Sequence, residues 1–554
     1  MSDVDGDINR SREHVYGGRK HSNLSNLERN CNEMFAKGPA LTKDFFEKIQ
    51  NDVVPPKTDL FGYTMNTRRF ILLTGLIILF TFSTIGTITM WFTEVYKKQI
   101  NSLLVITDEA PTYEMWRSPT VKPYIKIYIF NYTNVERYEM RKDKKLHVEE
   151  IGPYVYYEKL ERVNVRFNKV DGTVSYQEKR TYIFSPELSN GTKHDLVMVP
   201  NIPVLAGVSI AKHYNFFLRV SFSGFLSTLS VGAFIPLTVD QFVNGYEDNF
   251  YDWAKSYLKF HDMRVFEHFG LLVWKAGLQP DVITVNTGLH DISRRGQVEK
   301  FNGQTQIDLW GSDSCNSVQA SDGIIYPLTA LREKRDLTFY MPHMCRKLSL
   351  KFEKTSSILD SIPVHRYKLP LDTFDNEDKC YCTSGNGQCP PKGMFNATPC
   401  AFDAPLYYSW PHFYNGDPEL RANISGLKDD FLMNDTYANI HPSLGVLVGG
   451  KIKFQVNIEL QKSFGIGQLS AYPDRLMIPT VWMETGVEPS QLPIDFTTAL
   501  YQITFTVKNI ELGLKYGTLL ATMVTLTCIL LVLKKQRHNR SRASSHRRSI
   551  DYVH

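Results

Sequence analysis

Residues 70–92 read FILLTGLIILFTFSTIGTITMWF and residues 516–533 read YGTLLATMVTLTCILLVL, and neither stretch contains a charged side chain. About 20 apolar residues in a helix cross a hydrocarbon core about 30 Å thick, so both stretches predict transmembrane helices. The polar sequence between them therefore forms one long loop that is tethered to the membrane at both ends. This organisation excludes most classes of soluble enzyme.

The charges beside the apolar stretches predict the orientation. Arg68 and Arg69 precede the first stretch, and the residues after the second carry 7 Lys or Arg against 1 Asp, which is +6 (7 − 1) in a chain of net charge +5. Short flanks rich in Lys and Arg stay cytoplasmic, whereas a long loop is translocated largely regardless of its charge. We therefore expect a largely disordered cytoplasmic tail at 1–69, transmembrane helices at 70–92 and 512–533, an extracellular domain at 93–511 and a basic cytoplasmic tail at 534–554.

Six of the eight cysteines lie in the loop, namely Cys315, Cys345, Cys380, Cys382, Cys389 and Cys400. An even number of cysteines clustered in a translocated loop favours three disulfides. The alternative is a metal site around Cys380 and Cys382, but zinc ligands usually come in C-x2–4-C pairs and the spacing here fits poorly. We expect disulfides and no metal, and the spacing leaves the pairing open.

The loop also contains five Asn-x-Ser/Thr sequons, which predict glycans at Asn131, Asn190, Asn396, Asn423 and Asn434. The tails contain further sequons, such as those at Asn9 and Asn539. The motif therefore does not establish topology, which rests on the cysteines and the charges.

Several segments alternate apolar and polar residues with the period of a half-buried antiparallel strand. They are YIKIYIF (124–130), VYYEKLERVNVRF (155–167), TVSYQEKRTYIF (173–184) and KIKFQVNIELQKSF (451–464). Gly152-Pro153 and Asp171-Gly172 are typical of turns. The loop should therefore hold a largely antiparallel sheet.

Residues 203–237 break this alternation, because they are nearly continuous apolar sequence with Lys212 and Arg219 as the only firm charges. Val220–Leu237 is just long enough for a third transmembrane helix. We reject that interpretation, since an odd number of spans would place one tail outside. A helix packed in or on the extracellular domain is expected instead, and an exposed apolar surface there would be a candidate ligand or partner site.

Catalytic motifs are absent from the sequence: there is no G-x-S-x-G, H-E-x-x-H, Walker or strand-linked G-x-G-x-x-G pattern. His343 and His412 are interpreted as structural residues. The sequence thus predicts neither an enzyme nor a cofactor, and the basic tail marks topology or the inner membrane surface rather than nucleic-acid binding.

Five segments together resemble the class B scavenger receptor family, which includes fatty-acid translocase, lysosomal integral membrane protein and sensory neuron membrane protein. They are WRSPTVKPYIKIYIFNYTN (116–134), IGPYVYYEK (151–159), MPHMCRKLSLKFE (341–353), IPVHRYKLP (362–370) and PLYYSWPHFYNGDP (405–418). The cysteine order and the two-span topology match as well, and the resemblance covers roughly residues 90–533.

The resemblance implies an α+β ectodomain with an antiparallel β-barrel core, short helices and an apical helical bundle, plus two transmembrane α-helices. It also implies an apolar tunnel that conducts lipid toward the bilayer, and the disulfides Cys315–Cys380, Cys345–Cys400 and Cys382–Cys389. The partners implied are lipids or lipoprotein particles and the membrane bilayer, with a co-receptor or a second copy left open. The ligand-binding residues stay unknown at this stage.

Two departures from the family pattern narrow the hypothesis. Val220–Trp253 contains no Lys or Arg where the best-known member has a lysine cluster, which favours a neutral ligand such as a sterol, carotenoid, neutral lipid or pheromone-like molecule. The C-terminal tail lacks an acidic dileucine signal, which favours the plasma membrane over the lysosomal membrane. The alternatives are a phagocytic, adhesion or sensory co-receptor without lipid transfer and, less favoured, a two-span ligand-gated channel.

Overall fold

The computed structural model describes residues 57–60, 63–110, 112–260, 265–375, 380–382, 389–401, 403–428 and 436–550. The expectations for the tail at 1–56 and for Asn434 lie outside these residues. The chain divides into two units: one comprises the described residues up to Trp91 and from Lys515 onward, and the other runs from Phe92 to Leu514.

The first unit contains a short hairpin, β1 (Lys57–Leu60) and β2 (Tyr63–Asn66), the helix α3 (Thr67–Phe92) and most of α15 (Val507–Ile550). In the described part of the chain, two helices are long and apolar enough to cross a membrane, and they contain the two predicted stretches. They contact one another through Thr87 and Thr522, whose hydroxyl oxygens are 3.2 Å apart, and the Trp91 indole donates to the Lys515 carbonyl at 3.2 Å. Interhelical hydrogen bonds of this kind help to associate helices in lipid, where no hydrophobic force acts between them.

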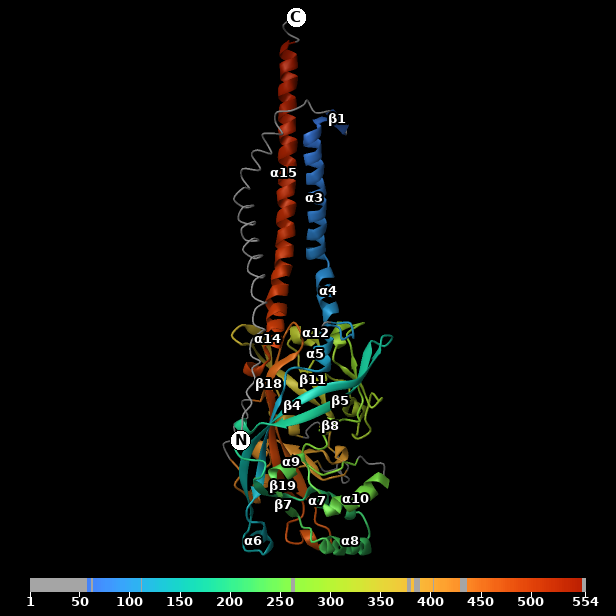
Figure 1. The fold of residues 1–554 in the computed structure, drawn as a ribbon, viewed down its shortest axis with the longest axis vertical. Coiled ribbons are helices and arrows are strands. Elements are labelled where there is room, and N and C mark those ends of the chain that lie inside the picture. Colours follow the sequence, from blue (N-terminus) through green and yellow to red (C-terminus); the bar gives the residue numbers. More distant parts are fainter. Residues whose placement is uncertain are drawn as a thin grey trace, which may run out of the picture. The chain divides into compact units, whose positions relative to one another are not determined.

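The second unit is built on one large antiparallel sheet (Figure 1). Its main path of paired strands is β10 (Val298–Phe301), β9 (Ile283–Asn286), β5 (Thr173–Phe184), β4 (Leu146–Asn168), β3 (Tyr124–Tyr132), β19 (Leu476–Val487), β18 (Leu447–Leu460), β17 (Tyr437–Ile440), β13 (Ile362–Lys368), β12 (Arg346–Ile358) and β11 (Leu337–Met341). The predicted strand segments all lie on this path.

The sheet closes into a barrel because one short segment bonds to both of its edge strands. On one side, the Val298 amide of β10 donates to the Ala320 carbonyl at 2.8 Å. On the other, the Ser321 amide donates to Thr338 of β11 at 3.0 Å, and the Tyr340 amide donates to Ser321 at 2.9 Å. The expected fold class, an α+β ectodomain with an antiparallel barrel and two terminal apolar helices, is confirmed.

Strand β3 shows how the sheet separates two apolar layers. Ile125, Ile127 and Ile129 belong to one buried cluster, which they share with side chains from β11, β12, β18 and β19 in the barrel interior. Phe130 and Tyr132 belong to a second cluster, which is shared with the helix α7 (Ile202–Ala211). Both faces of this part of the sheet are therefore covered, which makes the strand sequence more apolar than a simple alternation requires.

The turn predicted at Gly152-Pro153 is wrong, since these residues lie inside β4. The register with β3 shifts there, because Ile127 pairs with Tyr154 whereas Ile129 pairs with Ile151. The extra residue is a β-bulge, which moves the following side chains to the other face of the sheet. Val148 before the bulge accordingly packs in the outer cluster, and Tyr154 after it packs in the barrel interior.

Glycine is required at this bulge, and a side chain there should destabilise the fold. Gly152 has φ +110°, and a Cβ atom would lie 2.6 Å from the Ile127 carbonyl oxygen. We expect Gly152→Ala to lower the free energy of unfolding by about 2 kcal/mol or more, measured as a fall in the thermal midpoint of the detergent-solubilised chain at a fixed scan rate. The control is Gly311→Ala, where no atom lies within 4 Å of the added Cβ. Equal midpoints for the two variants would contradict the role of the bulge.

Candidate functional site

The helices α7, α8 (Phe216–Thr228) and α10 (Asn249–Phe260) lie at one end of the ectodomain unit, and α4 (Val95–Leu104) and α14 (Ile494–Tyr501) lie at its other end (Figure 1). Asn201 and Asn215 cap α7 and α8, because their side-chain oxygens accept the amides of Val204 and Leu218. The apolar run at 203–237 thus forms two short helices and the strand β7 (Phe234–Thr238), none of them long enough to span a bilayer.

Helix α8 leaves large apolar side chains in solvent at this end. We define the distal apolar patch as Phe216, Phe217, Leu218 and Val220 of α8 together with Phe464. Phe217 is 80% exposed and Phe464 is 81% exposed. The rings of Phe216 and Phe464 stack with their centroids 5.4 Å apart, so the patch is continuous between the two segments. A contiguous exposed apolar surface of this kind marks a binding surface.

The basic residues Lys212 and Arg219, which lie near the patch, are hydrogen-bonded within the protein. Lys212 donates a hydrogen bond to the Gln461 side chain, and Arg219 donates to the Ser463 hydroxyl at 3.4 Å. Both side chains are partly buried. The patch itself consists of hydrocarbon side chains, so it offers no ion-pairing group to a ligand.

The barrel interior provides a second apolar region. Its buried cluster combines Ile127 of β3, Leu350 of β12, Phe454 and Val456 of β18 and Met483 of β19. Sequence alternation predicted which face of each strand is apolar, but it could not show which residues from distant strands meet. That information requires the pairing order of the strands.

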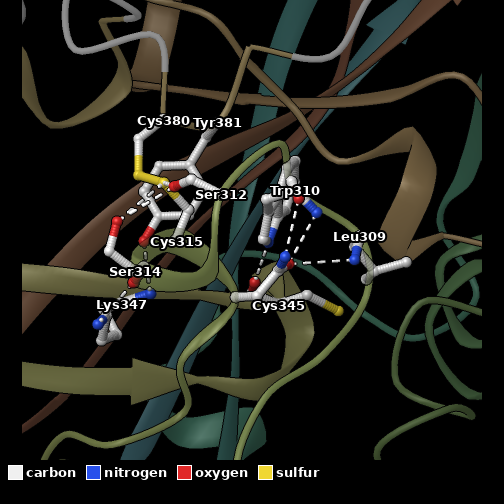
Figure 2. Close-up of a disulfide and its surroundings, with 10 residues drawn as sticks. Leu309, Trp310, Ser312, Ser314, Cys315, Cys345, Lys347, Cys380 and Tyr381 are labelled. Atoms are coloured by element: carbon white, nitrogen blue, oxygen red, sulfur yellow. Dashed lines mark hydrogen bonds between the residues drawn. A yellow bond between two sulfur atoms is a disulfide. The ribbon is translucent and has the colours of Figure 1, made fainter.

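Six cysteines form three disulfides in the structure, with Cα–Cα distances of 5.7 Å for Cys315–Cys380, 5.8 Å for Cys345–Cys400 and 5.0 Å for Cys382–Cys389. Figure 2 shows the first of them, with the Ser312 hydroxyl 2.8 Å from the Cys315 sulfur. The Trp310 indole beside it donates at 2.6 Å to the carbonyl of Cys345, a residue of the second bridge. Among the described residues, no cluster of His, Cys, Asp and Glu suits a metal ion.

The sequons differ in how exposed their asparagines are. Asn190 and Asn423 are exposed. Asn131 and Asn396 are partly buried, and their side-chain oxygens accept the amides of Met198 at 2.9 Å and Thr398 at 3.0 Å. The first two are therefore the most accessible to a glycosylating enzyme.

His412 lies in a buried polar cluster on the outer face of the sheet. Its Nδ1 accepts the Lys428 amide at 3.2 Å, so its Nε2 carries the proton and donates to Glu150 at 2.7 Å. Trp482 donates to the same carboxylate at 2.8 Å. Burial raises the pKa of Glu150, but the hydrogen bonds from His412, Lys428 and Trp482 outweigh it and hold the pKa at about 2. Every polar atom named here has a partner within the protein, which suits a structural role.

A second histidine, which sequence analysis did not single out, holds the base of the barrel to the segment that enters α15. His441 is fully buried, and its Nδ1 accepts the amides of Ser443 and Leu444. Its Nε2 therefore donates to the Thr504 hydroxyl at 2.8 Å. Thr504 lies in the π-helical turn η9 (Gln502–Thr506) that directly precedes α15.

Arg295 extends this hydrogen-bonded network to α4, the helix that follows α3 in the chain. It donates to the Leu444 carbonyl and, at 2.9 Å, to the carbonyl of Leu104, the last residue of α4. Because α4 follows α3 and η9 precedes α15 in the chain, one hydrogen-bonded network fixes both ends of the ectodomain. No short sequence motif signals it, since its members are far apart in the chain.

The fold and these features support a two-span membrane protein with one disulfide-bonded barrel domain between its two apolar helices. Comparison with protein families matches residues 73–533 to the CD36 family. The chain is 32% identical to scavenger receptor class B member 1 of Mus musculus over 389 residues, which cover 70% of this chain and 75% of the relative.

Two further relatives extend the comparison. Lysosome membrane protein 2 of Homo sapiens is 28% identical over 387 residues (68% of this chain and 78% of the relative). Sensory neuron membrane protein 1 of Bombyx mori is 29% identical over 426 residues (72% and 78%). The chain belongs to the CD36 family, in agreement with the resemblance found in its sequence.

The buried His441 predicts that acid destabilises the ectodomain. Burial, with a smaller contribution from the charge of His365, lowers the pKa of His441 to about 4. Between about pH 6.5 and 4 the His441 imidazole is therefore protonated in the unfolded chain and neutral in the folded chain. The free energy of unfolding should fall as the pH falls through this window, by on the order of 2–3 kcal/mol. Thermal midpoints measured at pH 7 and pH 4.5 should differ less for His441→Gln than for the native chain. The exposed His213→Gln control should keep the native difference, and an unchanged difference in His441→Gln would contradict this account.

Proposed function

We propose that this protein is a cell-surface receptor that binds lipid-bearing particles and transfers apolar lipid through its ectodomain to the membrane. The observation that carries the proposal is the distal apolar patch, exposed on the same domain whose barrel interior is apolar. Membership of the CD36 family supports it, since one relative is named a scavenger receptor. The patch would contact the particle and the barrel interior would shield the lipid.

The physical basis of such transfer is shielding from water. Each CH2 group kept out of water contributes about 0.8 kcal/mol, so a continuous apolar path removes most of the cost of moving a long chain across an aqueous gap. The proposed role needs no covalent step. It also needs no cofactor.

The proposed ligand class is neutral. The patch is formed by hydrocarbon side chains, and the nearby Lys212 and Arg219 donate their hydrogen bonds within the protein. A sterol, carotenoid, neutral lipid or pheromone-like molecule on a carrier suits such a surface better than an anionic particle, which requires opposite charge.

We further propose that the receptor lies in the plasma membrane with both termini cytoplasmic and residues 93–511 outside. The two apolar helices and the basic residues after Leu533 support this placement. Asn131, Asn190, Asn396, Asn423 and Asn434 would then carry glycans, with Asn190 and Asn423 the most accessible of the described sites. A lysosomal position is the alternative, given the relative named lysosome membrane protein 2.

Removing the two most exposed rings of the patch should weaken capture. Full burial of a Phe side chain contributes about 1.5–3 kcal/mol, so the double variant Phe217→Ser/Phe464→Ser should bind carrier particles at least about tenfold more weakly. Binding of neutral-lipid emulsion particles to cells that display equal amounts of receptor, measured at low temperature to prevent uptake, checks this.

The matched control is Val170→Ser, because Val170 is 86% exposed in the turn between β4 and β5 and lies outside the patch. Native-like binding by the control together with weak binding by the double variant supports the proposal. Native-like binding by the double variant would show that the patch does not capture particles.

A further inference from the structure

A pocket of about 290 Å³ lies on the outer face of the sheet, over β3 and β4. Tyr124, Lys126 and Tyr128 of β3 line it, and they alternate along that strand with the isoleucines of the barrel interior. Tyr157 of β4, which pairs with Tyr124, lines it as well. Ligand pockets usually measure about 300–1,000 Å³, so this one suits one or two sugar rings better than a long lipid chain.

The pocket combines aromatic rings with polar groups of both charges. Lys126 is 3.0 Å from Glu484, which also accepts the Tyr124 hydroxyl at 3.0 Å. Gln491 of the short helix η8 (Pro489–Gln491) and the preceding Glu488 add an amide and a carboxylate. A sugar matches this lining, because the C–H face of its ring packs on an aromatic ring while its hydroxyl and N-acetyl groups bond to polar tips. A hydrocarbon chain would leave those polar groups without partners.

The sequon at Asn190 lies at the rim of the pocket. Leu188, the last residue of the short helix η1 (Pro186–Leu188), lines the pocket two residues before Asn190. The Asn190 backbone amide donates to the carbonyl of Pro153, another lining residue, at 2.8 Å. The Asn190 side-chain nitrogen, to which a glycan would be attached, is 3.4 Å from the carbonyl oxygen of Gly152. The first sugars of such a glycan would therefore begin beside the pocket wall.

We propose that the pocket holds the first sugars of the N-linked glycan on Asn190, with their rings against the tyrosines and their polar groups on Glu488 and Gln491. The bound sugars would cover the aromatic side chains on the outside of β3 and β4 and would join η1 to η8. This inference rests on the proposed placement of residues 93–511 outside the cell, where Asn190 acquires its glycan. It does not depend on lipid transfer.

Trimming of the glycans on the folded full-length chain tests the proposal. The chain is produced in cells that make only high-mannose glycans and is treated, in detergent, with an endoglycosidase that cuts between the first two sugars. The Asn190 glycan should be trimmed about tenfold or more slowly than the glycan on the exposed Asn423, since cleavage follows the fraction of glycan that is out of the pocket. Mass spectrometry of the glycopeptides gives the rate at each site, and the denatured chain should show equal rates at both.

The variants test whether the pocket is the cause of the slow trimming. Tyr157→Ser removes a ring of the pocket and should raise the Asn190 rate to that of Asn423, whereas Tyr157→Phe keeps the ring and should keep the slow rate. The matched control is Tyr214→Ser, because Tyr214 is 45% exposed and lies outside the pocket. Should Tyr157→Ser fail to fold, the native and denatured chains still provide the comparison.

Several results would overturn the proposal. They are an Asn190 site without a glycan, equal trimming of Asn190 and Asn423 in the folded chain, as expected if the pocket serves a free ligand, and slow trimming that persists in folded Tyr157→Ser. None of these results bears on lipid transfer, which the particle-binding variants test separately. Absence of glycans from Asn190 and Asn423 alike would also contradict the proposed extracellular placement.

Discussion

The hydrogen bonds that residues 320–321 make to β10 and β11 close the sheet, and the properties of the ectodomain depend on that closure. An open sheet of this length would expose an interior face of aliphatic and aromatic side chains and two edges ready to pair with other chains. Closure instead gives the strands one shared interior.

Closure of the barrel does not by itself hold the two segments that lead to the apolar helices. The network through Arg295, Leu444 and His441 binds the last residue of α4 and the turn before α15 to the base of the barrel. Each of these two segments leads into an apolar helix, so the network joins the two chain ends of the ectodomain to one another. The distal helices lie at the opposite end of the unit, and the apolar patch of α8 is exposed there (Figure 1).

Some of this could be predicted from the sequence, for identifiable reasons. The segment 173–184 opens with alternating polar and apolar residues, and the strand β5 has those bounds. The stretch 70–92 lies within α3, since uncharged runs of that length have few alternatives in water. The bulge at Gly152-Pro153 was predicted as a turn, because a Gly-Pro pair occurs in both and the sequence of one strand does not distinguish them. Only the partner strand, with its shifted register at Ile127, distinguishes them.

The contacts among the residues of the candidate sites were harder to predict from the sequence. The disulfide pairing came from the family resemblance and not from the spacing of the cysteines. His441, Thr504 and Arg295 are brought together by the order of the strands, and no local sequence pattern joins them. For the run at 203–237, composition indicated an apolar surface, but which rings are exposed depends on how α8 packs against the segment at Phe464.

The measurement that tests the central claim most directly follows a neutral lipid and its carrier protein, each with its own label, into cells that display the full chain. The account predicts that lipid enters at growth temperature in large excess over carrier, and that the Phe217→Ser/Phe464→Ser variant loses most of this excess. Entry of lipid and carrier in their original ratio would contradict transfer through the ectodomain.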